Sequence, residues 1–109
     1  MTQVLAQAAD AEDPLLISAV NWGEIVYMLR QKAGKIGPDE AAALINSFPI
    51  DVVPADRIAA EKASAYKIAG LLSYADSFAA ALTHEAQGEL LTADRGFETV
   101  KDRIKIIWL

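Results

Sequence analysis

"LLTADRGF", residues 90–97, is the stretch on which the interpretation of this sequence depends. Its short apolar run stops at Asp94, and Gly96 and Phe97 follow directly. An apolar run of this kind, bounded by polar residues, is typical of a buried strand. A carboxylate at the end of such a strand has two interpretations. Asp94 either begins the next helix, or the sheet delivers it to a site that needs negative charge.

Strand and helix patterns alternate along the rest of the chain. Apolar or β-branched runs predict strands, whereas apolar residues at helical spacing, closed by Gly, predict helices. The predicted strands are 15–20, the β-branched stretch 50–56, which Pro54 halts, 89–94 and 104–109. The predicted helices are 2–11, 21–34, 37–48, 55–70, 73–88 and 95–103. This alternation predicts a single α/β domain, 1–109, with a parallel sheet and helices on both faces. In such sheets, ligands bind at the carboxyl ends of the strands.

The composition excludes several classes of protein. With 109 residues, 53% hydrophobic and 23% charged, the chain is long enough for one globular core and too apolar for disorder. We expect no transmembrane helix and no secretory signal, because no apolar run is long enough and the first residues have no basic or apolar region. The absence of cysteine excludes disulfides and thiolate metal sites and fits a cytoplasmic protein. A net charge of −5 disfavours nonspecific nucleic-acid binding, although carboxylates gathered around a metal also make a chain acidic.

Three acids stand out by position: Glu24, Asp76 and Asp94. The structural interpretation is that they cap helices. Asn21 with Glu24, and Ser73 with Asp76, have the spacing of capping boxes, in which a polar residue accepts a backbone hydrogen bond and an acid three residues later reaches back. Asp94 would then be the N-cap of the short helix that follows it.

The functional interpretation is that these three carboxylates point into one cleft. Carboxylates held close together repel one another unless a cation lies between them, so such a cluster predicts a cation site. Mg²⁺ and Mn²⁺ prefer oxygen ligands, and a bound ion can activate water and stabilise a phosphodiester transition state. Thr92, two residues before Asp94, would face the same side and orient a ligand or water. Both interpretations are compatible, because an acid in the first turn of a helix can cap it and also bind metal.

Three stretches resemble a known family. "ISAVNWGEIVYML" (17–29), "LLSYADSFAAALTHEAQGELLTADRGF" (71–97) and "IKIIWL" (104–109) are similar to the body of PIN-domain ribonucleases of the VapC toxin family. The resemblance covers residues 3–109 and implies a Mg²⁺- or Mn²⁺-dependent endoribonuclease that cleaves RNA, is restrained by an antitoxin protein and is usually a homodimer. It also implies that Glu24, Asp76 and Asp94 are the metal ligands and that Thr92 supplies the hydroxyl before the last of them.

The chain departs from that family at its beginning. Members normally start with an apolar strand ending in Asp-[Ser/Thr]-Ser, which runs through the middle of the sheet and supplies the first metal ligand. No such strand is found here, and Asp10, Glu12 and Asp13 lie in a polar stretch that does not replace it. A gap in the sheet would leave unpaired backbone groups, each costing about 1–3 kcal/mol if buried. We therefore expect the strands 15–20 and 89–94 either to pair directly or to be closed by a partner subunit.

The departure has three explanations: a truncated product or misplaced start, a degenerate homologue, or an assembly that closes the sheet differently. With one family acid absent, we expect a metal-dependent ribonuclease that holds one ion weakly. The alternative is a catalytically silent module that keeps the fold and pairs with an antitoxin-like partner or with itself. A receiver-like phosphoacceptor domain is a third hypothesis, for which Lys105 is poorly placed.

Overall fold

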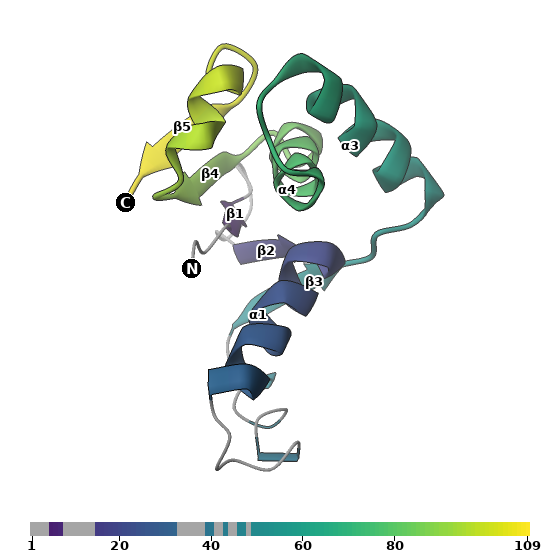
Figure 1. Cartoon of the computed structure of the whole chain (residues 1–109), viewed down its shortest axis with the longest axis vertical. Helices are drawn as coiled ribbons and strands as arrows, with labels where there is room; N and C mark the ends of the chain where they lie inside the picture. Colours follow the sequence, from purple (N-terminus) through teal and green to yellow (C-terminus); the bar gives the residue numbers. More distant parts are fainter. Residues whose placement is uncertain (1–4, 8–14, 33–38, 41–42, 44–45, 48) are drawn as a thin grey trace.

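The computed structural model describes residues 5–7, 15–32, 39–40, 43, 46–47 and 49–109. Its strands are β1 (Leu5–Gln7), β2 (Leu15–Ser18), β3 (Ile50–Val53), β4 (Glu89–Thr92) and β5 (Lys105–Trp108). They form one sheet in the order β3-β2-β1-β4-β5 (Figure 1). The pairs β2–β3 and β4–β5 are parallel, as predicted, whereas β1 runs antiparallel to both β2 and β4. The α/β class is confirmed, and the sheet is mixed.

The central strand is the main difference from the prediction. A helix over 2–11 is wrong for the part that the structure describes, because Leu5–Gln7 is a strand. Direct pairing of β2 with β4, or closure by a partner, is wrong as well, because β1 lies between them and pairs with both. The expectation that the backbone groups at the facing edges of β2 and β4 are hydrogen-bonded was correct. The same chain supplies them from its N-terminal segment.

The other predicted elements agree with the structure to within a few residues. The helices are α1 (Ala19–Lys32), α3 (Arg57–Ala69) and α4 (Tyr74–Glu85), and the predicted short helix after β4 is a 3₁₀ helix, η1 (Arg95–Val100). The predicted helix 37–48 lies largely outside the described residues, of which 39, 40, 43 and 46 are helical. No helix in the described ranges combines the length and apolar character needed to cross a membrane.

Helix α4 is the central packing element. It contacts β1, β2 and β4 on the sheet, and α3 packs against it from the other side, as Figure 1 shows. Its sequence suits this position, because Ser73 caps its first turn and small residues then allow close packing. The cluster of buried side chains comprises Tyr66, Leu72, Ala79, Ala80, Ala81, Leu90, Phe97, Val100 and Ile104. This core fixes α4, β4 and η1 relative to one another.

The sheet brings four strand ends to a common edge. Because β1 is antiparallel to both of its neighbours, β2 and β4 point the same way, and their parallel partners β3 and β5 follow them. The carboxyl ends of these four strands therefore meet at one edge, where α/β proteins bind ligands. Strand β1 begins at this edge, with Leu5 opposite Leu91, and leaves it, with Gln7 opposite Glu89.

Candidate functional site

Asp94 lies at the carboxyl end of β4 and caps η1. Its carboxylate Oδ1 accepts a hydrogen bond from the Gly96 N–H at 2.9 Å, and its own N–H donates to Thr92 Oγ1 at 3.0 Å. The cap that the sequence predicted is therefore present. Thr92 is fully buried, so its hydroxyl holds the backbone of Asp94 in place. A Cβ on Gly96 would lie 3.2 Å from Asp94 Oδ1, so glycine lets the carboxylate approach the turn closely.

Asp76 lies in the first turn of α4 and is surrounded by negative charge. The Ser73 hydroxyl accepts a hydrogen bond from the Asp76 N–H at 3.1 Å, which confirms the predicted cap at Ser73. Burial raises the pKa of the Asp76 carboxyl above its usual value, and the charge of Asp94 raises it further. A hydrogen bond with the Ser73 side chain lowers this pKa, while the charge of Glu24 and a side-chain hydrogen bond with Asp94 raise it.

Glu24 reaches this neighbourhood on α1. The predicted capping box of Asn21 with Glu24 is wrong, because α1 already begins at Ala19. The cap is Ser18, whose Oγ accepts from the Asn21 N–H at 3.1 Å and also donates to Asn21 Oδ1. The Asn21 side-chain amide in turn donates to the Ala75 carbonyl at 3.0 Å. This buried connection joins the first turn of α1 to the first turn of α4, so Glu24 and Asp76 are held on adjoining helix ends.

The three carboxylates are not equivalent in this arrangement. Asp94 and Glu24 both act on Asp76 through their charges, and the effect of Asp94 is larger than that of Glu24, which is exposed. In the ranges that the structure describes, no three His, Cys, Asp or Glu side chains lie close enough to hold one metal ion together. None of the ion pairs between described residues includes any of these three acids. Among the residues that the structure describes, no cationic side chain therefore forms an ion pair with Asp76 or Asp94.

This electrostatic arrangement predicts an unusual dependence of stability on pH. Because the Asp76 pKa is raised in the folded state, folding disfavours its charged form. Stability from this group is present below the unfolded pKa of about 3.9 and is lost as pH rises through the higher folded pKa. We expect Asp76→Asn to remove this loss. In metal-free buffer, the melting temperature of the variant minus that of the wild type should increase as pH rises from acid to neutral. Circular dichroism measures both melting temperatures. A constant difference across that range would contradict the prediction.

The polar connection beneath the site gives a second prediction. Ser18 and Asn21 are only 5% and 4% exposed, so Asn21→Ala would leave the Ala75 carbonyl and the Ser18 hydroxyl without their partner. The Ser18 hydroxyl would still accept from the backbone N–H of residue 21, but its own O–H would have no acceptor. An unpaired buried polar group costs about 1–3 kcal/mol. We expect the free energy of unfolding to fall by about that amount in urea denaturation. Gln31→Ala, at an exposed position of the same helix, should change it by less than about 0.5 kcal/mol.

The sequence did not single out Ser18, although a serine that ends a buried apolar strand carries a signal. A hydroxyl at this point either caps the helix that follows or lines the strand-end site. Asn21 was noted at the strand end, but its partner Ala75 is 54 positions away, and a backbone carbonyl has no sequence signature. The link between α1 and α4 therefore becomes visible only in the folded chain.

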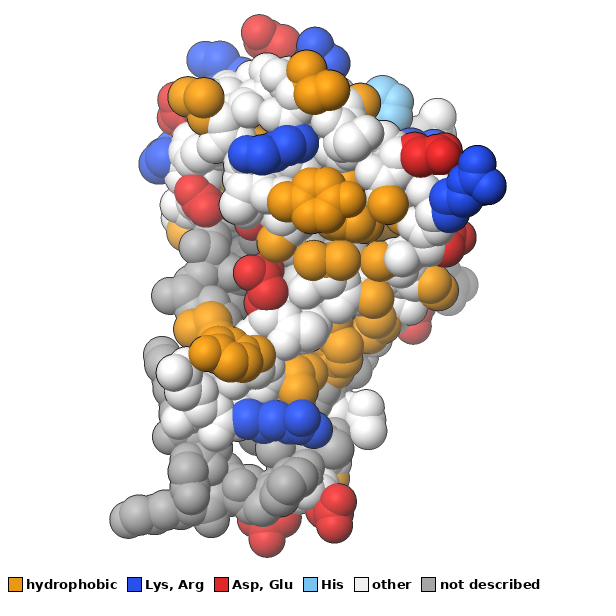
Figure 2. Space-filling view, turned by 45° about the vertical axis from the view of Figure 1, so that its right-hand side comes forward, with side chains coloured by type: hydrophobic (Ala, Val, Ile, Leu, Met, Phe, Trp, Pro, Cys, Tyr) orange, Lys and Arg blue, Asp and Glu red, His pale blue; other side chains and the backbone are white. Residues whose placement is uncertain are grey.

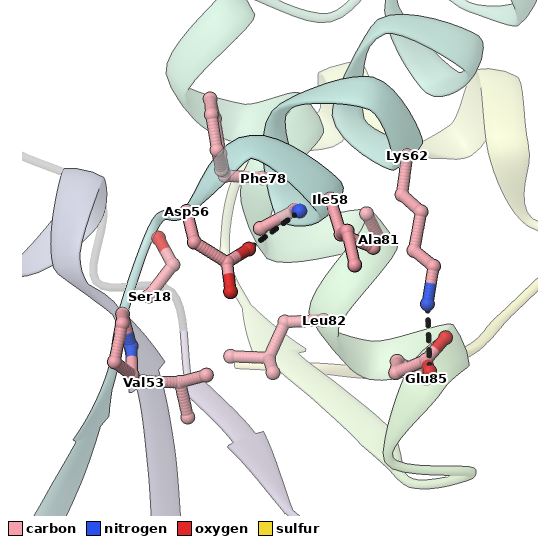
Figure 3. Close-up of a pocket in the computed structure, with 11 residues that line it drawn as sticks. Ser18, Val53, Asp56, Ile58, Lys62, Phe78, Ala81, Leu82 and Glu85 are labelled. Carbon is pink, nitrogen blue, oxygen red and sulfur yellow. Dashed lines mark hydrogen bonds and ion pairs between the residues drawn. The ribbon is translucent and has the colours of Figure 1, made fainter.

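A second feature near this edge is an apolar pocket of about 380 Å³ between β3, α3 and α4. Val53, Ile58, Ala81 and Leu82 line it, and an ion pair of 2.7 Å between Lys62 Nζ and Glu85 Oε1 lies at its side (Figure 3). Ile58 is 60% exposed, so the pocket continues onto the surface. Hydrophobic side chains also gather in a band on the face shown in Figure 2. The pocket, which is lined mainly by apolar side chains, suits an apolar partner group.

The sequence of this chain matches one known protein family. The family model described as "PIN domain" matches residues 2–103, which is most of the chain. Searches of curated proteins and of solved structures found no match. The match covers strands β1 to β4, helices α1, α3 and α4, and Glu24, Asp76, Thr92 and Asp94, and it ends before β5. The PIN domain is generally a nuclease fold, and PIN nucleases typically use divalent metal ions. By this match and by its α/β architecture, the chain belongs to the PIN domain family.

Proposed function

We propose that this protein is a metal-dependent endoribonuclease of the VapC toxin type. The observation that carries the proposal is the position of Asp76, a half-buried carboxylate whose pKa is raised first by burial and then by the charges of the neighbouring Asp94 and Glu24. Folding keeps these like charges together, and no ion pair between described residues offsets them, which is costly unless the site binds a cation. Membership of the PIN domain family supports the nuclease assignment.

Asp76 and Asp94 are the residues that fit a divalent ion. Both offer carboxylate oxygens, and Mg²⁺ typically takes one or two carboxylates together with waters. Glu24 adds negative charge to the same neighbourhood. We therefore assign Asp76 and Asp94 as ligands of Mg²⁺ or Mn²⁺ and Glu24 as the third acid of the site. Strand β1 brings no carboxylate to this edge, because its residues are Leu5, Ala6 and Gln7.

Each residue has a separate role in the proposed cleavage of RNA. Divalent ions lower the pKa of water and stabilise charge that develops on a phosphodiester. Asp94 is held by Gly96 and by Thr92, so its carboxylate stays in one orientation during the reaction. Thr92 is thus a positioning residue. Asp76 would bind the ion as a carboxylate, and the bound cation would offset the repulsion from Asp94 and Glu24 that raises its pKa in the free protein.

The partners follow from this function. The substrate is RNA, and an antitoxin protein restrains the activity, as in the toxins that the sequence resembles. We further propose that the protein forms a homodimer and acts in the cytoplasm, where the absence of cysteine suits a reducing environment.

The decisive experiment is RNA cleavage by purified protein. We expect a single-stranded RNA to be cut in Mn²⁺ or Mg²⁺, cleavage to stop in EDTA, and activity to return when excess Mn²⁺ is added. The melting temperature of the protein should also rise with Mn²⁺, because an ion that binds only the folded state stabilises it. Cleavage that continues in EDTA, or the absence of both cleavage and stabilisation, would contradict the proposal.

The apolar pocket favours a second candidate, a catalytically silent binding module. It opens beside Ile58 and offers mainly apolar atoms to a partner, which is the chemistry of an antitoxin-like segment or of a second copy. In this case the protein would not cut RNA, and Ile58→Asp would lower partner affinity without unfolding the chain. Analytical ultracentrifugation of the wild type and of Ile58→Asp, each alone and mixed with a candidate antitoxin, tests this by measuring the mass of the complexes. Metal-dependent cleavage that is unaffected by Ile58→Asp supports the ribonuclease instead.

A further inference from the structure

A second pocket lies at the opposite end of β4, β5 and α4 from Asp76 and Asp94. It has a volume of about 380 Å³ and is formed where α4 ends and β5 begins. His84 and Gln87 come from the end of α4, and Arg103 and Lys105 come from the segment that enters β5. Eight residues of α4 separate Asp76 from His84, or about 12 Å along the helix axis. The pocket is therefore separate from the proposed metal site.

The charge of this pocket is opposite to that of the whole protein. The chain has a net charge of −5, yet Arg103 and Lys105 line the pocket together with His84, and its described lining contains no carboxylate. Within the described ranges, the ion pairs of the protein involve neither Arg103 nor Lys105. Glu85, which follows His84, is paired with Lys62 at 2.7 Å. Glu89 lies opposite Lys105 in the strand register without forming an ion pair with it.

The backbone at the end of α4 does not need these cations either. The last carbonyls of a helix lack partners within it and often attract Lys or Arg side chains. Here the Ala86 N–H donates to the Leu82 carbonyl, the Gly88 N–H to the Thr83 carbonyl, and the Gln87 N–H to the His84 carbonyl. The positive φ of 51° at Gln87 makes this turn possible. Three of the last carbonyls of α4 are thus satisfied by backbone N–H groups, and no hydrogen bond between described residues joins Arg103 or Lys105 to this helix end.

Tyr66 adds a polar group beside these cations. Its ring centroid lies 6.2 Å from that of His84, and Arg103 is near enough to act on the Tyr66 hydroxyl through its charge. A phenol hydroxyl donates hydrogen bonds while it stays protonated. Tyr66 does not line the pocket itself, whose guanidinium, ammonium and imidazole groups are donors that match the oxygens of a phosphate.

We propose that this pocket, lined by His84, Arg103 and Lys105, binds a phosphate group. Arg103 supplies the planar pair of donors that fits phosphate oxygens, and Lys105 supplies a point charge. The phosphate belongs either to the backbone of RNA or to a free nucleotide. Because the pocket lies away from the carboxylates, its occupation does not depend on a divalent ion or on cleavage.

The test uses the full chain, labelled with ¹⁵N, in EDTA. Inorganic phosphate, ADP and a short single-stranded RNA are titrated separately, and amide shifts are followed by NMR. We expect the amides of Gly88, Ile104 and Lys105 to shift. Arg103→Gln should weaken the affinity roughly tenfold, as expected for the loss of one charge-assisted hydrogen bond.

Lys101→Gln is the matched control, because it removes one positive charge from an exposed residue nearby that does not line the pocket. Its affinity should stay close to that of the wild type. Pocket shifts with RNA as well as phosphate identify a backbone contact, and shifts with phosphate and ADP alone identify a free nucleotide. The absence of pocket shifts with every probe, or equal losses in Arg103→Gln and Lys101→Gln, would overturn the proposal. Failure of RNA cleavage in Mn²⁺ leaves this result unaffected.

Discussion

Asp94→Asn is expected to reduce Mn²⁺-dependent RNA cleavage by about a hundredfold or more, because even residues that only support a metal ligand contribute 10- to 100-fold. Asparagine keeps the carbonyl oxygen that accepts from the Gly96 N–H at 2.9 Å, so the cap of η1 is preserved. The substitution removes the negative charge that neighbours Asp76. Initial rates of cleavage of a labelled RNA, measured at saturating Mn²⁺, give the effect directly.

Asp51→Asn is the matched control for this experiment. Asp51 is an exposed residue of β3, and it undergoes the same chemical change at a position that neighbours none of the three acids. Its activity should equal that of the wild type, and both variants should retain the wild-type circular dichroism spectrum. Equal cleavage by Asp94→Asn and wild type would show that Asp94 is only a helix cap. Capping of η1 would then account for the position of its carboxylate without a bound metal ion.

The two interpretations of Asp94 could be stated from the sequence, and the cap could be predicted in detail. A carboxylate after an apolar strand and two residues before a glycine has the local geometry for a cap, and the Gly96 N–H does donate to it. The neighbourhood of Asp94 with Asp76 also follows from parallel strands and from a helix that begins at the same edge. How strongly the charge of Asp94 raises the pKa of Asp76 depends on tertiary packing, which no local pattern specifies.

Strand β1 shows where such reasoning fails. Its residues, Leu5–Gln7, are all compatible with a helix. The sequence around the apolar pair Val4 and Leu5 therefore predicted a helix over 2–11. What makes them a strand is the pair of open edges on β2 and β4, whose backbone groups need partners. This demand comes from segments up to 86 positions away, as in the pairing of Leu5 with Leu91. A tertiary requirement of this kind outweighs a weak local preference.

The 3₁₀ helix η1 begins directly after Asp94, and the buried Phe97 anchors this helix in the core. Phe97 is fully buried in the core cluster, beside Leu90 and Val100, and its N–H donates to the Asp94 carbonyl at 3.3 Å. Phe97→Ala is therefore expected to lower the free energy of unfolding by about 3–5 kcal/mol, because it removes the transfer energy of the ring and leaves a cavity. That is a large part of the 5–15 kcal/mol typical of a domain. Urea denaturation followed by circular dichroism measures the loss.

Leu71→Ala is the control for this prediction, because Leu71 is 86% exposed and should change stability by less than about 0.5 kcal/mol. If Phe97→Ala is too unstable to purify, Phe97→Leu keeps an apolar side chain and should cost less, while still loosening the turn that carries Asp94. A loss below about 1 kcal/mol for Phe97→Ala would mean that the site collapses around the cavity. The core would then not hold Asp94 in place, and the orientation of its carboxylate would depend on Thr92 and Gly96 alone.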